Sequence, residues 1–273
     1  GAAQFITGTE EILGLYRPDA DLSRELFITT FVNPNHAAAL LLMSSLVSFG
    51  LWLDSRQTIH SRALLVMSAL LGLGVLATGS TANSLLLAAG LPLTGLWTSR
   101  RFEADQRARV LRALMGSFML AAIAIMVTDP VGWWDTAISP YIPHDGAGPW
   151  THIAEIWKIG ASVAQDHQGF GVGFGSFPIA AAVTMESWSS GFVNFAHNLF
   201  LEGAASWGVF VMAVVSVLVF MALVSAARRA ETGVQVAIVV ALSATVVQNG
   251  VDFSLQIPGV GYCWAALLGT ILV

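Results

Sequence analysis

Charged residues are scarce in this chain, and their scarcity decides its class. Only 11% of the 273 residues are Asp, Glu, Lys or Arg, whereas soluble domains carry about 25%. Hydrophobic residues make up 55% of the chain, and the mean hydropathy is +0.71. The composition therefore excludes an ordinary soluble domain and indicates an integral membrane protein.

Cysteine is almost absent. The single cysteine, Cys263, lies in the last apolar run, which excludes a disulfide framework and a thiolate metal site. Three histidines, His144, His152 and His167, are scattered through a long polar segment without the spacing of metal ligands. We therefore expect no metal ion.

Basic residues are absent from most of the chain as well. Nine of the 12 fall into three short segments: Arg56 and Arg62, Arg100 to Arg112, and Arg228 with Arg229. Cytoplasmic loops of membrane proteins concentrate Arg and Lys in this way, so we predict that these segments lie in the cytoplasm. Because topology explains the clusters, we expect no nucleic-acid partner.

Long apolar runs separate the basic segments. The stretch 63–97 holds no charged residue and has basic segments at both ends. One helix of that length would reach about 52 Å, beyond a hydrocarbon core of about 30 Å, so we predict two helices that meet outside at residues 78–83. The predicted fold is all-α: a polytopic transmembrane helix bundle, one membrane domain over 1–273, with about seven spans at 36–53, 63–78, 83–97, 110–127, 203–227, 233–251 and 257–273.

This topology leaves residues 128–202 as a large loop outside the cytoplasm. Apolar residues between Ile153 and Val163 recur at helical spacing, which predicts an amphipathic helix over 150–167 that lies on the outer surface. The Gly-rich stretch 169–177 follows no predicted strand, so it favours a flexible wall beside a site over a dinucleotide fold. A loop on this side cannot rely on ATP.

The two ends of the sequence also shape the expectation. The chain begins at Gly1 without an initiator Met and ends within an apolar run at Val273. We expect it to be a fragment of a longer polytopic protein that has further spans at its N-terminus.

Polar motifs stand at the outer ends of the predicted spans. They read TFVNPNHAAALLL from Thr30, DHQGFGVGFGSF from Asp166, AHNLFLEGAASWG from Ala196 and VDFSLQIPGVGYCWAALLG from Val251. In this order and spacing, the motifs resemble those of the bacterial O-antigen ligase/polymerase family, and the likeness covers nearly the whole chain.

The resemblance implies a membrane glycosyltransferase of the bacterial inner membrane. Such an enzyme moves a glycan from a polyprenyl-diphosphate carrier to a saccharide or lipid-glycan acceptor at the extracytoplasmic face, without a nucleotide sugar, metal or other cofactor. An outward-facing site fits this chemistry, because a lipid diphosphate is an activated donor that exists on that side. Membrane lipids are the remaining expected partners.

His197 is the predicted catalytic residue. Transfer to a hydroxyl needs a base that accepts its proton, and a histidine with a pKa near 6.5 suits that task. The resemblance implies that the His of the His-Asn motif carries activity, while the alternative is a helix cap. We expect Asn198 to hold the imidazole ring and Glu202 to orient it or to lie in solvent.

The other predicted substrate-binding residues are Asn33, Asn35, Arg24 and Lys158. Asn33 and Asn35 flank a proline, so helix capping competes with a role in lining the site.

The chain differs from the family pattern at two positions. There the resemblance implies arginines that bind the donor diphosphate. Thr81 and Ile153 stand at their positions. The outer basic residues Arg17, Arg24 and Lys158 are the candidates to replace them. His36 is expected to be an interface residue.

Two other functions stay open. A transporter of lipid-linked saccharides would carry ionisable residues inside its spans, and the apolar runs contain essentially none. A non-catalytic relative that only binds glycan lipid is compatible with the two absent arginines.

Overall fold

The computed structural model describes residues 31, 33–55, 59–100, 108, 110, 149–184 and 193–273. Within these residues the secondary structure is helical and contains no strand, which confirms the all-α class. The predicted span at 110–127, apart from residue 110, and the first part of the outer loop at 128–148 lie outside the described residues.

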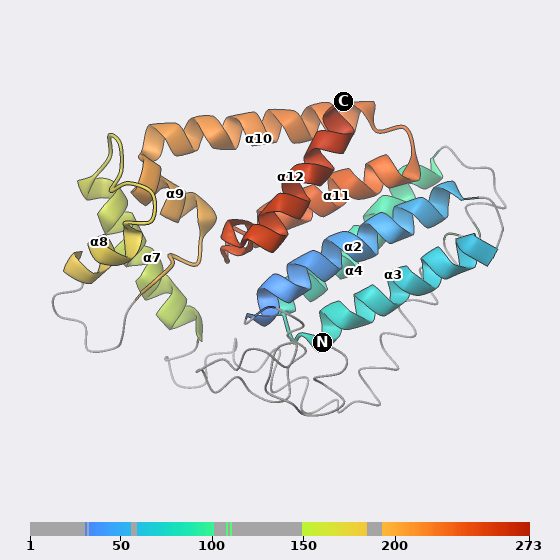
Figure 1. Ribbon diagram of the computed structural model, residues 1–273, viewed down its shortest axis with the longest axis horizontal. Coiled ribbons are helices and arrows are strands. Elements are labelled where there is room, and N and C mark those ends of the chain that lie inside the picture. The colour runs from blue at the N-terminus through green and yellow to red at the C-terminus, as the bar shows by residue number, and fades with distance from the viewer. Residues whose placement is uncertain are drawn as a thin grey trace.

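In the described part of the chain, four helices pack together as the main bundle: α2 (Pro34–Asp54), α3 (Ile59–Ala77), α4 (Thr81–Ser99) and α11 (Gly233–Gln248) (Figure 1). Small residues let α2 and α11 approach closely, since a Cβ atom on Gly50 would stand 2.5 Å from that of Ala237. The core between the helices is apolar and includes Ala38, Leu42, Leu46, Val75, Leu87, Val240 and Leu242.

Three described helices are long and apolar enough to cross a membrane: α2, α3 and α10 (Val209–Arg229). The rest of the protein covers these helices to different degrees. In α2, 61% of the apolar stretch is buried, whereas in α10 only 11% is buried. A helix that is apolar all round and uncovered by protein suits contact with lipid. The shorter α12 (Pro258–Leu272) completes this part of the molecule.

The apolar run predicted as one span at 203–227 is divided between two helices. α9 (Leu199–Trp207) ends at Gly208, and α10 begins directly after it. Gly208 has a φ of 88°, and a Cβ atom there would overlap the carbonyl of Gly169. Glycine is needed for both reasons, and hydropathy alone does not register such a break.

Three helices, α7 (Pro149–Asp166), α8 (Phe177–Thr184) and α9, pack together at one side of the molecule (Figure 1, left). α7 is amphipathic, as predicted. Its buried residues Ile159, Val163 and Ala164 belong to one apolar cluster with residues of α8 and α9. Its apolar side is therefore covered by protein rather than by a membrane surface. We call α7, α8 and α9 the three-helix group.

The Gly-rich segment between α7 and α8 is anchored to α9. The N–H groups of Val172 and Gly173 donate to the carbonyls of Ala205 and Ser206, each at 2.9 Å. Gly171 has a φ of 67°, and a Cβ atom there would overlap the Ser206 backbone. The sequence predicts a flexible wall here, whereas the structure holds the segment by backbone hydrogen bonds.

Candidate functional site

Segments far apart in the sequence converge where α2 begins and α11 ends. The rings of His36 and His197 both meet Phe253 edge-on, with centroid distances of 4.9 Å and 5.1 Å. Phe195 stacks on Phe253 at 4.1 Å with an interplanar angle of 9°. We call this region the histidine end of the bundle. It joins the start of α2, the turn before α9 and the segment after α11.

His197 has an unusual backbone conformation. Its φ of 49° is the only positive value at a non-glycine residue in the described part of the chain. This left-handed region costs a side chain of L chirality about 1–2 kcal/mol, so the surrounding contacts must hold it. Trp157 of α7 supplies one of them, because its indole N–H donates to the His197 carbonyl at 3.2 Å. Strain of this kind clusters at functional sites.

Asn198 fixes the turn from the other side. Its side-chain oxygen accepts hydrogen bonds from the N–H groups of Phe200 and Leu201, both at 3.0 Å, and so caps α9. Its amide N–H donates to the Gly250 carbonyl at 2.9 Å. Asn198 therefore holds the backbone beside His197 and ties it to the end of α11.

Glu202 acts on the same turn from within α9. The residue is 7% exposed, and its carboxylate accepts a hydrogen bond from the Ala196 N–H at 2.9 Å. Burial raises the pKa of this carboxyl group, and hydrogen bonds from Ala196 and Gln256 oppose the shift. Glu202 was expected either to orient the imidazole or to lie in solvent. The described geometry shows that it is not solvated, and that it supports the backbone just before His197.

Asp252 is a buried carboxylate that the sequence reasoning missed. It is 3% exposed and accepts hydrogen bonds from the Gln248 amide and, at 2.8 Å, from the Phe253 N–H. Burial raises its pKa to about 6, against these two hydrogen bonds. One signal in the sequence could have found it, since Asp252 is the single acidic residue between Glu231 and the C-terminus.

His36, expected to be an interface residue, is buried at the histidine end. It is 5% exposed, and its Nε2 lies 3.9 Å from Oδ1 of Asp252. That distance exceeds a hydrogen bond, and Nε2 has no hydrogen-bond partner among the described residues. His36 and Asp252 thus bring two titratable groups beside the ring that His197 contacts.

The asparagines of the first motif support the start of α2. The Asn33 side chain accepts a hydrogen bond from the Asn35 N–H at 2.8 Å and caps the helix. The Asn35 carbonyl accepts a bond of 3.4 Å from Asn83 of α4. Asn83 is fully buried, and its Oδ1 has no hydrogen-bond partner within the described part of the structure. A buried polar atom without a partner requires an explanation.

Of the predicted phosphate-binding cations, one lies among the described residues. Lys158 is exposed on α7 and directly follows Trp157, which contacts the His197 backbone. Arg17 and Arg24 lie outside the described residues. Thr81 begins α4 and Ile153 lies on α7, so neither helix supplies an arginine at these positions.

Fold and site together define an all-α membrane protein whose polar and titratable side chains gather around a strained histidine at one end of the bundle. The family model described as O-antigen ligase matches residues 66–216. The chain belongs to the O-antigen ligase family, a family of glycosyltransferase type that acts on lipid-linked glycans and saccharides. No curated protein matches the chain. The matched range includes His197, Trp157 and the Gly-rich segment.

Proposed function

We propose that this protein transfers a glycan from a polyprenyl-diphosphate carrier to a hydroxyl group of a saccharide or lipid-glycan acceptor, at the extracytoplasmic face of the bacterial inner membrane. The observation that supports the proposal most is the strained backbone of His197, at φ 49°. Trp157, Asn198 and, through Ala196, Glu202 hold this turn in place. Such an arrangement is expected where one side chain must be presented in a fixed direction.

His197 is the general base of the proposed reaction. The acceptor oxygen attacks the anomeric carbon of the donor, and the bond from that carbon to the diphosphate oxygen breaks. The imidazole accepts the proton that the acceptor hydroxyl loses, and the polyprenyl diphosphate leaves with the bonding electrons. Positioned general bases contribute about 10²–10⁴-fold to such reactions.

The donor diphosphate needs a cation near His197. Lys158 lies next to Trp157 on α7 and is exposed, so we assign it to the diphosphate, together with Arg24. A lysine ammonium acts as a point charge, whereas the arginines implied by the family resemblance would form two parallel hydrogen bonds. Asn33 and Asn35 stand at the entrance of α2 as further lining residues.

Replacement of His197 tests the proposal. His197→Ala in the membrane-embedded protein, supplied with a polyprenyl-diphosphate-linked glycan and an acceptor, should lose transfer by about 100-fold or more. His167→Ala is the matched control, because that exposed histidine follows α7, away from Phe253, and its Nδ1 contacts the Val163 carbonyl. Transfer by His197→Ala at a rate near that of His167→Ala would reduce His197 to a structural residue.

The same assay separates the alternatives. A lipid-linked saccharide transporter would move the donor without consuming it, and a non-catalytic binding relative would retain the donor unchanged. The release of free polyprenyl diphosphate by the parent protein, and its loss in His197→Ala, fits only the transferase.

A further inference from the structure

Two aromatic side chains project from the Gly-rich segment between α7 and α8. Phe170 is 91% exposed and Phe174 is 87% exposed. Among the large apolar side chains that the structure describes, only the C-terminal Val273 is more exposed. Two neighbouring phenylalanines held in water are unfavourable for a folded protein, so this surface calls for a partner.

The segment cannot bury these rings by folding back. Val172 lies between them, packs against the apolar cluster of the three-helix group and donates its N–H to Ala205. Gly173 donates to Ser206, and Gly171 approaches the same backbone too closely for any side chain. Val172 is therefore held inward, while Phe170 and Phe174 on either side of it stay exposed.

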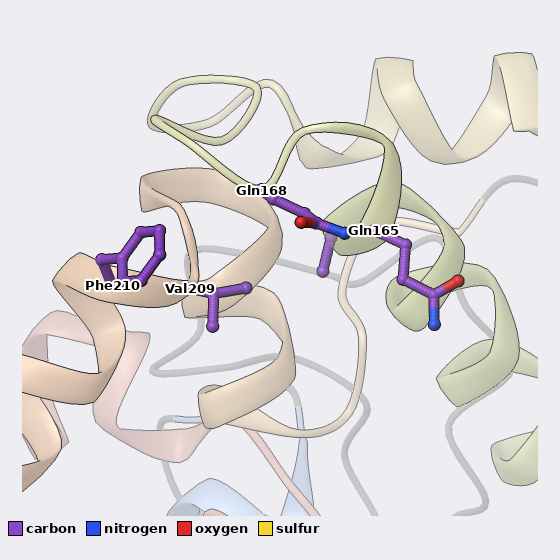
Figure 2. A pocket seen from close by; sticks show the side chains of 5 residues that line it. Gln165, Gln168, Val209 and Phe210 are labelled. Carbon is purple, nitrogen blue, oxygen red and sulfur yellow. The ribbon is translucent and has the colours of Figure 1, made fainter.

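The neighbouring surface is the start of α10. A pocket of about 250 Å³ beside the segment is lined by Gln165 of α7, by Gln168 just after that helix, and by Val209 and Phe210 of α10 (Figure 2). Phe210 is 73% exposed. The apolar stretch of α10 is only 11% buried. Gly169, the neighbour of Phe170, meets Gly208 at the start of this helix, so the segment begins beside the exposed apolar surface of a helix that can cross a membrane.

The chemistry of the segment favours lipid over saccharide as the partner. Residues 169–184 contain no charged residue, so entry into a bilayer would strip no charge of water. Residues 169–175 consist only of Gly, Phe and Val and supply no side-chain hydrogen-bond donor or acceptor for sugar hydroxyls. Phenylalanine is among the residues typical of apolar faces that enter the boundary between headgroups and acyl chains.

We propose that Phe170 and Phe174 insert into the boundary between headgroups and acyl chains, in the leaflet that surrounds the start of α10. The Gly-rich segment is then a second membrane contact, which holds the three-helix group against the bilayer beside α10. The proposal depends on membrane embedding alone, so its outcome is independent of whether His197 is catalytic.

Single spin labels in the reconstituted protein test the insertion. In a Cys263→Ser background, Phe170→Cys or Phe174→Cys carries a nitroxide, and the protein is placed in phosphatidylcholine vesicles. Collisions with oxygen, which concentrates in lipid, are compared with collisions with a water-soluble nickel chelate. Val214→Cys on the exposed face of α10 is the lipid reference, and Asp166→Cys at the exposed end of α7 is the water reference.

The oxygen-to-nickel collision ratio at positions 170 and 174 should exceed that at Asp166→Cys several-fold and approach that at Val214→Cys. Ratios equal to the water reference would overturn the proposal. A water-like ratio that changes only when an acceptor saccharide is added would also overturn it, because the segment would then contact glycan. Phe170→Leu with Phe174→Cys is a second variant, in which the label at 174 should keep its lipid-like ratio if both positions insert.

Discussion

The two ends of the α2–α11 helix pair differ in how well their buried polar groups are hydrogen-bonded. At the end of α2, both carboxylate oxygens of Asp54 accept hydrogen bonds from the first N–H groups of α11, at 2.6 Å from Gly233 and 2.8 Å from Val234. At the histidine end, His36 and Asn83 keep buried polar atoms without partners among the described residues, and His197 occupies a left-handed conformation.

This difference suggests that the Asp54 end serves stability and that the histidine end serves function. Satisfied helix ends stabilise a fold, and Thr232 with Gln235 adds a capping box beside Asp54. Unsatisfied buried groups and strained backbone are unfavourable for folding and persist where a site requires them. We therefore expect substitutions at the Asp54 end to change stability alone, and substitutions at the histidine end to change transfer.

The largest expected effect on stability comes from the Gly-rich segment, which is anchored to the end of α9. Gly171→Ala combines a positive φ with an overlap against the Ser206 backbone, so the free energy of unfolding should fall by about 2–4 kcal/mol. Gly175→Ala is the matched control, because it shares a positive φ but has open space around it. Denaturant unfolding that gives equal losses for the two variants would contradict the anchored segment.

Asp252 should make the histidine end sensitive to pH. Its pKa in the folded protein is raised to about 6 from 3.8, so the folded state binds this proton more tightly than the unfolded state. The protonated carboxyl group therefore favours the fold below about pH 4, and this contribution is lost as the pH rises through about 6. The free energy of unfolding should fall across this interval by at most about 3 kcal/mol.

Unfolding temperatures measured between pH 4 and pH 7 check this expectation. Asp252→Asn cannot titrate at this position, so the difference in stability between the parent and this variant should change across the interval in the stated direction. A difference that stays constant with pH would show that the Asp252 carboxyl group has the same pKa in both states.

Asp54→Ala tests the opposite end. Loss of both acceptors for the α11 N–H groups should lower the free energy of unfolding by about 1–2 kcal/mol, while the rate of transfer per folded molecule stays unchanged. Thermal unfolding and the transfer assay on the same preparation measure the two quantities. A fall in transfer comparable with that of His197→Ala would show that the two ends are not functionally distinct.

The smallest expected effect concerns Lys158. Lys158→Met should weaken binding of the lipid diphosphate several-fold, and Lys158→Arg should retain or strengthen it, because the guanidinium group can form two hydrogen bonds to phosphate. Binding measured at low and high salt should show the greater difference at low salt, since the side chain is exposed. Equal binding by the Met variant and the parent would leave Lys158 as an interfacial residue.

Composition and helical spacing are local properties, and they predicted the all-α membrane fold and the amphipathic helix α7. The resemblance of four motifs predicted the family. It did not predict the break at Gly208, since the overlap with Gly169 exists only after α7 and α9 pack together. The proximity of His36 to Asp252 was out of reach for the same reason, because these residues are neighbours only through the packing of α2 against the end of α11.

Asn198 shows a further limit of sequence reasoning. The sequence suggested that it holds the imidazole ring, whereas the structure shows its side chain bonded to the backbone of α9 and of Gly250. An asparagine before a helix predicts a cap, but only the fold reveals that this cap also joins α9 to the end of α11.

The rate of transfer by His197→Gly, compared with His197→Ala, tests the central claim most directly. Both variants lack the imidazole, but glycine adopts the φ of 49° without strain. The account predicts that both lose transfer by about 100-fold or more. The free energy of unfolding of the glycine variant should exceed that of the alanine variant by about 1 kcal/mol. Transfer at the parental rate by His197→Gly, in which the turn is intact and the base is gone, would contradict the account.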